Sequence, residues 1–209
     1  MKFQDFKIEA LKTESNVTDV STNVLYLEVL LNLAFNVTEA VDVLKKNIYY
    51  KKEIDPQKMD SVLDAIIMTA AAARMMYKQS LGMDEETKAQ VIRPVSEIMD
   101  PRYLHGVLGV FTEAGELLQT LGKQEGNLDR ANIAEEVGDV MWYLALIEDS
   151  VGVDVEGAMD TVIAKLKQRY PDKFTTHSAT VRDLEAERRI LEEGIAPKAN
   201  APEGTGGSF

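Results

Sequence analysis

Two acidic pairs with helical spacing are the feature that most constrains how this chain can fold. Glu113 and Glu116 form the first pair, and Glu136 and Asp139 form the second. Residues three apart in a helix lie on one face, a turn apart, so each pair presents two neighbouring carboxylates. On two facing helices, the four carboxylates would form a cage for hard divalent cations such as Mg²⁺. The spacing therefore predicts two packed helices with a site suited to a phosphate-bearing substrate.

The surroundings of these pairs differ from those of ordinary surface acids, although a single ExxE motif is usually solvated. At about 100° per residue, apolar side chains cover one side of the first helix. The other side has no Lys or Arg and consists of His105, Gly109, Thr112, Glu113, Glu116 and Thr120. The second helix is apolar all round from Met141 to Ile147, which indicates burial. Because unpaired buried charge is costly, acids on this helix need a partner, and a metal supplies one.

Three segments carry a family resemblance. They read HGVLGVFTEAGE at 105–116, EEVGD at 135–139 and KLKQRYP at 165–171. Together they resemble the MazG-like all-α nucleoside triphosphate pyrophosphohydrolases, a superfamily that includes the dimeric dUTPases and the phosphoribosyl-ATP pyrophosphohydrolases. Its signature is ExxE followed, after a spacer, by ExxD. The resemblance is strong over roughly 100–175 and weaker elsewhere, and it implies an all-α helical bundle of MazG-like type.

The resemblance also implies a reaction. The expected enzyme depends on Mg²⁺, with Mn²⁺ as an alternative ion, and converts a (d)NTP to (d)NMP and pyrophosphate in nucleotide-pool control. Its catalytic and metal-binding residues would be Glu113, Glu116, Glu136 and Asp139. A dUTPase or dCTPase and a phosphoribosyl-ATP pyrophosphohydrolase are the alternative enzymes. A non-catalytic helical protein that binds a metal or nucleotide is the alternative of another class, and the complete tetrad with its basic segment favours an enzyme.

Further residues are candidates for substrate contact. Lys165 and Arg169 are spaced i, i+4, and with the KLKQRYP match we expect them to bind substrate phosphates. Tyr170 joins them as a candidate, or it merely ends the helix. His105 shares a helical face with the first acidic pair and either contacts base or phosphate or is a polar residue at the helix start. Glu135 is either an additional general-base candidate or a surface acid.

Helical periodicity predicts a succession of helices at about 1–15, 24–50, 55–79, 85–96, 103–122, 129–150, 154–170 and 178–193. Asp100-Pro101 separates an N-terminal half, 1–99, from a catalytic half, 100–176. A C-terminal helix, 177–193, and a disordered tail, 194–209, follow. Trp142 and Tyr143 come one turn after the second acidic pair, and we expect them to be core residues rather than platforms for a base.

The N-terminal half is predicted to be a degenerate copy of the catalytic half. TEAVDVL at 38–44 aligns with TEAGELL at 112–118 at an offset of 74 residues, and Asp64 aligns with Asp139 at an offset of 75. In the copy, Asp42 takes the place of Glu116, and Ser61 takes the place of Glu136. No basic segment follows the copy. We expect one working site and one that has lost its function, the alternative being chance similarity between amphipathic helices.

Composition limits which cellular compartment and which binding partners we expect for this protein. A formal net charge of −12 disfavours binding to nucleic acid or to an anionic membrane. The absence of cysteine excludes disulfides and thiolate chemistry. The start, MKFQDFKIEAL, lacks a signal-peptide core and no apolar run is expected to reach transmembrane length, so we expect a cytoplasmic protein. The apolar helices of the N-terminal half exceed what a lone bundle buries, which predicts a homo-oligomer, a dimer or larger.

Overall fold

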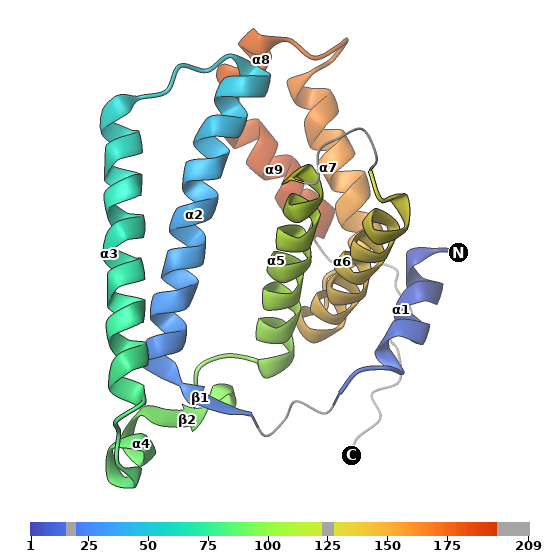
Figure 1. Ribbon diagram of the computed structural model, residues 1–209. Coiled ribbons are helices and arrows are strands. Elements are labelled where there is room, and N and C mark those ends of the chain that lie inside the picture. Colours follow the sequence, from blue (N-terminus) through green and yellow to red (C-terminus); the bar gives the residue numbers. More distant parts are fainter. Residues whose placement is uncertain (16–19, 123–127, 196–209) are drawn as a thin grey trace. The chain divides into compact units, whose positions relative to one another are not determined.

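The computed structural model describes residues 1–15, 20–122 and 128–195, and these are almost entirely helical (Figure 1). The all-α fold expected from the sequence is confirmed. Contacts divide the chain into two compact units, Met1–Val151 and Gly152–Phe209. The predicted domain limits follow sequence similarity rather than contacts and stay a prediction. The tail predicted to be disordered lies, from residue 196 onwards, outside the described residues.

Capping side chains mark the helix starts of the first unit. Asn23 begins α2 (Val24–Tyr50) by accepting the backbone N–H of Tyr26 at 3.1 Å. Asp55, followed by a proline, begins α3 (Pro56–Ser80) in the same manner. These side chains satisfy N–H groups that a helix start otherwise leaves unpaired. The other helices described in this unit are α1 (Phe3–Leu11), α4 (Glu85–Val91), α5 (Pro101–Gly122) and α6 (Arg130–Val151).

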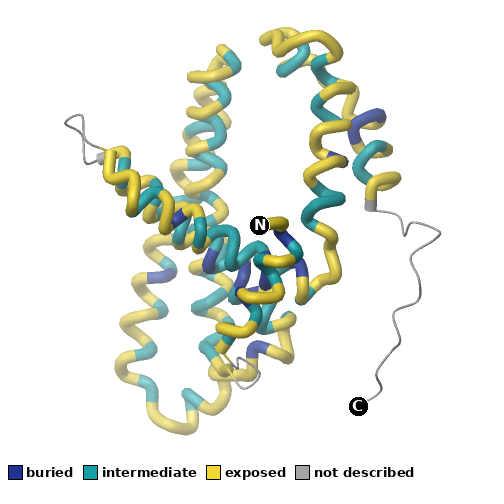
Figure 2. Tube along the Cα trace, turned by 90° about the vertical axis from the view of Figure 1, so that its right-hand side faces the viewer, coloured by how far each residue is buried: buried dark blue, intermediate teal, exposed yellow. Residues whose placement is uncertain are grey.

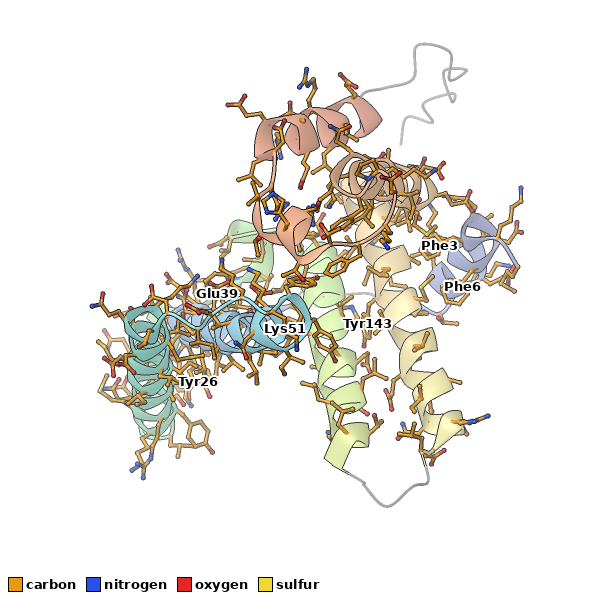
Figure 3. All side chains as sticks on the ribbon, turned by 90° about the horizontal axis from the view of Figure 1, so that it is seen from above. Phe3, Phe6, Tyr26, Glu39, Lys51 and Tyr143 are labelled. Carbon is orange, nitrogen blue, oxygen red and sulfur yellow. The ribbon has the colours of Figure 1, made fainter. Side chains whose placement is uncertain are left out.

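Consecutive helices pair into two hairpins, α2 with α3 and α5 with α6 (Figure 1). Glycines on α5 let α6 approach closely. A Cβ on Gly106 would lie 2.6 Å from Cγ1 of Ile147, and one on Gly109 would overlap the ring of Tyr143. Figure 3 shows Tyr143 between these two helices. The close packing of α5 against α6 therefore requires the absence of side chains at these two positions.

Helix α1 packs on α6. Phe3 and Ala10 are buried. The indole Nε1 of Trp142 donates hydrogen bonds to the carbonyl of Ala10 (3.1 Å) and to Oγ1 of Thr13 (2.9 Å). Trp142 is thus a packing residue that fastens the N-terminal helix to the hairpin.

A short two-stranded sheet replaces the end of one predicted helix. β1 (Ser21–Asn23) pairs antiparallel with β2 (Ile92–Pro94), and Thr22 lies opposite Arg93. The helix predicted at 85–96 ends at Val91, and a 3-10 turn, η1 (Val95–Glu97), follows β2. Proline disfavours the helical conformation in the residue before it, which accounts for the extended backbone ahead of Pro94.

Among the described helices, α2 is long and apolar enough to cross a membrane by length and composition alone. This finding corrects the expectation that no apolar run reaches such a length. Helices that pack within soluble bundles meet the same criterion. Few residues of α2 and α3 are buried (Figure 2), and Phe35, Ile67 and Met68 are 62%, 65% and 72% exposed. The hairpin presents a broad apolar surface.

The described part of the second unit consists of α7 (Val155–Arg169), α8 (Thr176–Thr180) and α9 (Leu184–Ile195). It differs from the single helix predicted at 178–193, because residues 181–183, between α8 and α9, are not helical. The carboxylate of Asp183 accepts the backbone N–H of Ala186 at 2.9 Å and so starts a new helix. Such local capping competes with continuation of the preceding helix. Helix α9 then packs against α7.

Candidate active site

The first acidic pair lies on α5, a turn apart, as predicted. Glu113 is half-buried and Glu116 is exposed. Across the hairpin, α6 brings Glu136 to the same place. Each of these three residues has a carboxylate oxygen, and these oxygens lie within 4.8 Å of one another. We call Glu113, Glu116 and Glu136 the acid cluster.

Glu136 is the buried member of the acid cluster. It is 4% exposed, and its Oε1 accepts a hydrogen bond from Nδ2 of Asn132, one turn earlier on α6. An amide that holds a carboxylate in this way fixes the direction of both oxygens, as hydrogen bonds to metal-binding carboxylates do elsewhere. Asn132 and Glu136 are four residues apart, so this contact follows from helical spacing.

Several negative charges lie close together at the acid cluster. Burial raises the pKa of Glu113, and hydrogen bonding to Glu136 and the negative charges of Glu116 and Asp139 raise it further. Burial also raises the pKa of Tyr143, with the charges of Glu113 and Asp139 as smaller causes. The ion pairs found in the described part of the chain do not involve the cluster. A cation would relieve the repulsion.

The fourth acid, Asp139, lies outside the group of three. It is exposed, one turn further along α6 than Glu136, yet its charge reaches Glu113 and Tyr143. Glu135 is exposed as well. A metal-binding role for Asp139 and a general-base role for Glu135 both stay predictions.

The donor atoms of the cluster fit a hard divalent cation. Carboxylate oxygens on two helices are the ligands that such cations take, with water in the remaining positions. Two of the three acids retain access to solvent, so a bound ion would keep positions for water or phosphate oxygens. The fit rests on the convergence of Glu113, Glu116 and Glu136 and on the lack of a protein cation beside them in the described residues.

His105 lies in aromatic packing between α5 and α6. Its ring centroid is 5.5 Å from that of Tyr143 and 6.0 Å from that of Trp142, both in edge-on arrangements. Its Nδ1 is buried and has no hydrogen-bond partner in the described residues. The geometry shows a packing contact, and the predicted contact of His105 with substrate stays a prediction.

A comparison with family models adds an independent observation. The model described as the MazG nucleotide pyrophosphohydrolase domain matches residues 105–174. This segment therefore matches the MazG domain family. The resemblance read from the sequence motifs is confirmed, and it includes nucleotide pyrophosphohydrolase activity at the level of the domain family. No curated protein and no solved structure matches the chain.

The matched segment extends into the second unit, where α7 carries the basic residues expected to bind phosphate. Arg169 donates two hydrogen bonds to Glu187 of α9, from Nε to Oε1 (2.8 Å) and from Nη2 to Oε2 (2.5 Å). Its Cζ lies 5.7 Å from the ring centroid of Tyr170, which follows α7. Lys165 lies one turn before Arg169 and is half-buried. Contact of these residues with substrate phosphates stays a prediction.

Sequence reasoning missed Glu187, which lies beyond the MazG domain. It is 3% exposed, and Arg169 and Arg182 together hold its pKa at about 2 by hydrogen bonding. The segment LEAERRILEE contains several acids, and spacing alone does not show which of them is buried. The available signal was that Glu187 shares a helical face with Leu191, four residues later.

Proposed function

We propose that the chain is a Mg²⁺-dependent nucleoside triphosphate pyrophosphohydrolase that converts a (d)NTP to (d)NMP and pyrophosphate. One observation carries the proposal: three carboxylates from two helices meet within 4.8 Å inside the matched MazG segment. The net charge of −12 repels an anionic nucleotide, so a cation at the cluster is needed for approach. Mn²⁺ is expected to replace Mg²⁺.

The residues of the chain supply position and charge. A divalent cation, when bound by the acid cluster, would stabilise charge on phosphate oxygens and lower the pKa of a water towards neutrality. Asn132 keeps the Glu136 carboxylate directed into the site. In the reaction, a water oxygen joins one phosphorus of the α–β anhydride as the anhydride bond breaks, and its proton passes to a carboxylate or to solvent.

A product assay tests this function. The protein is incubated with Mg²⁺ and each of the eight standard nucleoside triphosphates and dUTP, and the products are separated by chromatography. We expect monophosphate and pyrophosphate in equal amounts from one or a few substrates. Diphosphate with orthophosphate would overturn the assigned reaction, and no turnover with either Mg²⁺ or Mn²⁺ would overturn the enzyme proposal.

We further propose a homo-oligomer, as the sequence predicted. The α2–α3 hairpin exposes large apolar side chains, among them Phe35, Ile67 and Met68, and a patch of this kind normally marks an interface. A second copy could cover this surface. We expect light scattering at micromolar protein to give at least twice the chain mass of 23.2 kDa.

Paired variants sharpen the test of the oligomer. Replacing Ile67 and Met68 with serine should reduce the measured mass, because both are large apolar side chains that are mostly exposed in the single chain. The matched change of Val181 and Leu184, 64% and 62% exposed in the second unit, should leave the mass unchanged. A monomeric wild-type chain would refute the proposal.

A further inference from the structure

A groove with a volume of about 550 Å³ runs between α2 and α5. Both helices belong to the first unit, and they run in the same direction (Figure 1). The groove is mainly apolar, and its lining includes Val37, Val41, Phe111, Ala114 and Leu118. Its volume is within the range of pockets that hold small organic ligands, and such pockets combine apolar walls with a few polar groups.

The groove and the acid cluster occupy adjoining faces of α5. Thr112 and Gly115 line the groove, and they alternate along the helix with Glu113 and Glu116. Oγ1 of Thr112 lies 3.4 Å from Oε1 of Glu113, so one hydroxyl joins the groove wall to the cluster. The groove therefore lies next to the place where the phosphates of a ligand bound at the cluster would be.

The two walls of the groove come from positions that the predicted repeat makes equivalent. The offset of 74 residues relates Val37 to Phe111 and Thr38 to Thr112. Helices α3 and α6 begin at the same offset, at Pro56 and Arg130. The degenerate half thus faces the working half, with its own acidic motif lying across the groove from the intact one.

The acids of the degenerate motif have different surroundings. The carboxylate of Asp42 pairs with Lys45 at 2.7 Å and also with Lys46, and hydrogen bonds from these two lysines lower its pKa. Glu39 also lines the groove, and it is half-buried (labelled in Figure 3). Within the described part of the chain, Glu39 has no ion pair or side-chain hydrogen bond. It is an available acceptor beside an apolar surface.

We infer that this groove binds the nucleoside end of the substrate, with the base between α2 and α5 and Glu39 accepting a hydrogen bond from a base N–H. The inference rests on the proposed function, because the acid cluster is what places the phosphates at the groove's edge. Every common base has an N–H donor and two flat apolar faces, which the carboxylate and the apolar walls complement.

Matched variants of α2 test the inference. Val41→Trp fills the groove, and Ile48→Trp places the same side chain two turns further along α2, outside the groove lining. The two positions are 51% and 49% exposed, so neither change disturbs a core. Glu39→Gln keeps the shape of the side chain and removes its charge. Circular dichroism checks that each variant folds, and Glu39→Gln still tests the groove if Val41→Trp unfolds.

Two readouts are measured on each variant. Steady-state hydrolysis gives KM and kcat, and NMR titration with the uncharged nucleosides, in EDTA, gives binding without metal or phosphate. We expect Val41→Trp to raise KM and the nucleoside Kd about tenfold or more, and Glu39→Gln to raise both about fivefold, with kcat within about threefold. Ile48→Trp should match the wild type in both.

The outcomes separate this inference from the proposed function. If the wild type hydrolyses nucleotides and neither Val41→Trp nor Glu39→Gln changes KM, the groove assignment is overturned and the function stands. If the wild type hydrolyses nothing, the function fails and the titration decides: loss of nucleoside binding in Val41→Trp supports the groove, and no binding by the wild type overturns it. A fall in oligomer mass in Val41→Trp with unchanged nucleoside binding also overturns it, because the groove then holds a second copy.

Discussion

The hairpins α2–α3 and α5–α6 have similar helical patterns, but the acidic side chains of the two hairpins have different neighbours. In α5–α6, three carboxylates converge and one of them, Glu136, is buried. In α2–α3, the acid at the position of Glu116 is Asp42, and it pairs with the lysines three and four residues later. On α5 those two positions carry Gln119 and Thr120. The acids of α5 and α6 therefore keep their negative charge available to a cation, whereas the charge of Asp42 is neutralised by its neighbours.

The packing of the two hairpins differs for a related reason. The offset of 74 residues puts Asn32 and Phe35 of α2 at the positions of Gly106 and Gly109 of α5. The glycines admit the side chains of α6, whereas Phe35 is 62% exposed. Close approach of α5 and α6 brings their acids together, and the first hairpin lacks the glycines that permit it.

The largest expected effect concerns the acids of the intact hairpin. Glu116→Gln or Asp139→Asn should lower kcat/KM about a thousandfold, because each removes a charge that the bound cation requires. Asp64→Asn, the change at the position equivalent to Asp139, should leave kcat/KM within about twofold. Product assays and circular dichroism provide the measurements, since helicity should be unchanged. Near-wild-type turnover in Glu116→Gln or Asp139→Asn would show that the residue is not part of the metal site.

A second prediction concerns Glu187, which, unlike the acid cluster, is paired with arginine side chains. Glu187 is buried between Arg169 and Arg182, so Glu187→Gln should destabilise the second unit by about 3 kcal/mol. Glu192→Gln removes an exposed pair with Arg188 and should cost less than about 0.5 kcal/mol. Thermal unfolding measures both, and equal effects would contradict the buried pair.

The same pair makes stability depend on pH. The pKa of Glu187 is about 2 in the folded chain, below its ordinary value of 4.5. The ionised carboxylate favours the folded state, so its contribution is present above about pH 4.5 and is lost as pH falls towards about 2. The difference in melting temperature between wild type and Glu187→Gln should therefore shrink between pH 6 and pH 3. A constant difference would argue against ionisation as the cause.

A third prediction transfers the charge pattern of α2 to α5. The double variant Gln119→Lys and Thr120→Lys should pair with Glu116, as Lys45 and Lys46 pair with Asp42, and lower kcat/KM about tenfold at limiting Mg²⁺. The double alanine variant at the same positions controls for the loss of the native side chains. Raising the Mg²⁺ concentration should recover part of the activity. Full activity of the lysine variant at limiting Mg²⁺ would show that neutralising lysines do not explain the difference between Asp42 and Glu116.

The smallest expected effect tests the glycine packing. Gly109→Ala should destabilise the α5–α6 hairpin by about 1–2 kcal/mol, because the new Cβ overlaps the Tyr143 ring. Gly138→Ala, where a Cβ meets nothing within 4 Å, should stabilise α6 by about 0.5–1 kcal/mol. Chemical denaturation measures the two variants. Stabilisation by both would mean that α5 and α6 are not closely packed at Gly109.

Much of the site was predictable because helical spacing is a local property. Glu113 and Glu116, and Asn132 and Glu136, share helix faces by arithmetic alone. The family resemblance rested on short motifs and is confirmed over 105–174. The strand at Ile92–Pro94 was not predicted, because its pairing partner at Ser21–Asn23 lies far away in the chain. The partner of Arg169 was missed for the same reason.

The sequence by itself determined most of the helices and the faces on which the acids lie, because these depend on residues within a few turns of one another. Tertiary structure alone decided which faces meet. It placed Glu136 against Glu113 and Glu116 while Asp139 remained exposed, and it set α2 across a groove from α5. Packing between distant segments depends on the fit of whole surfaces, and spacing along a single helix does not contain that information.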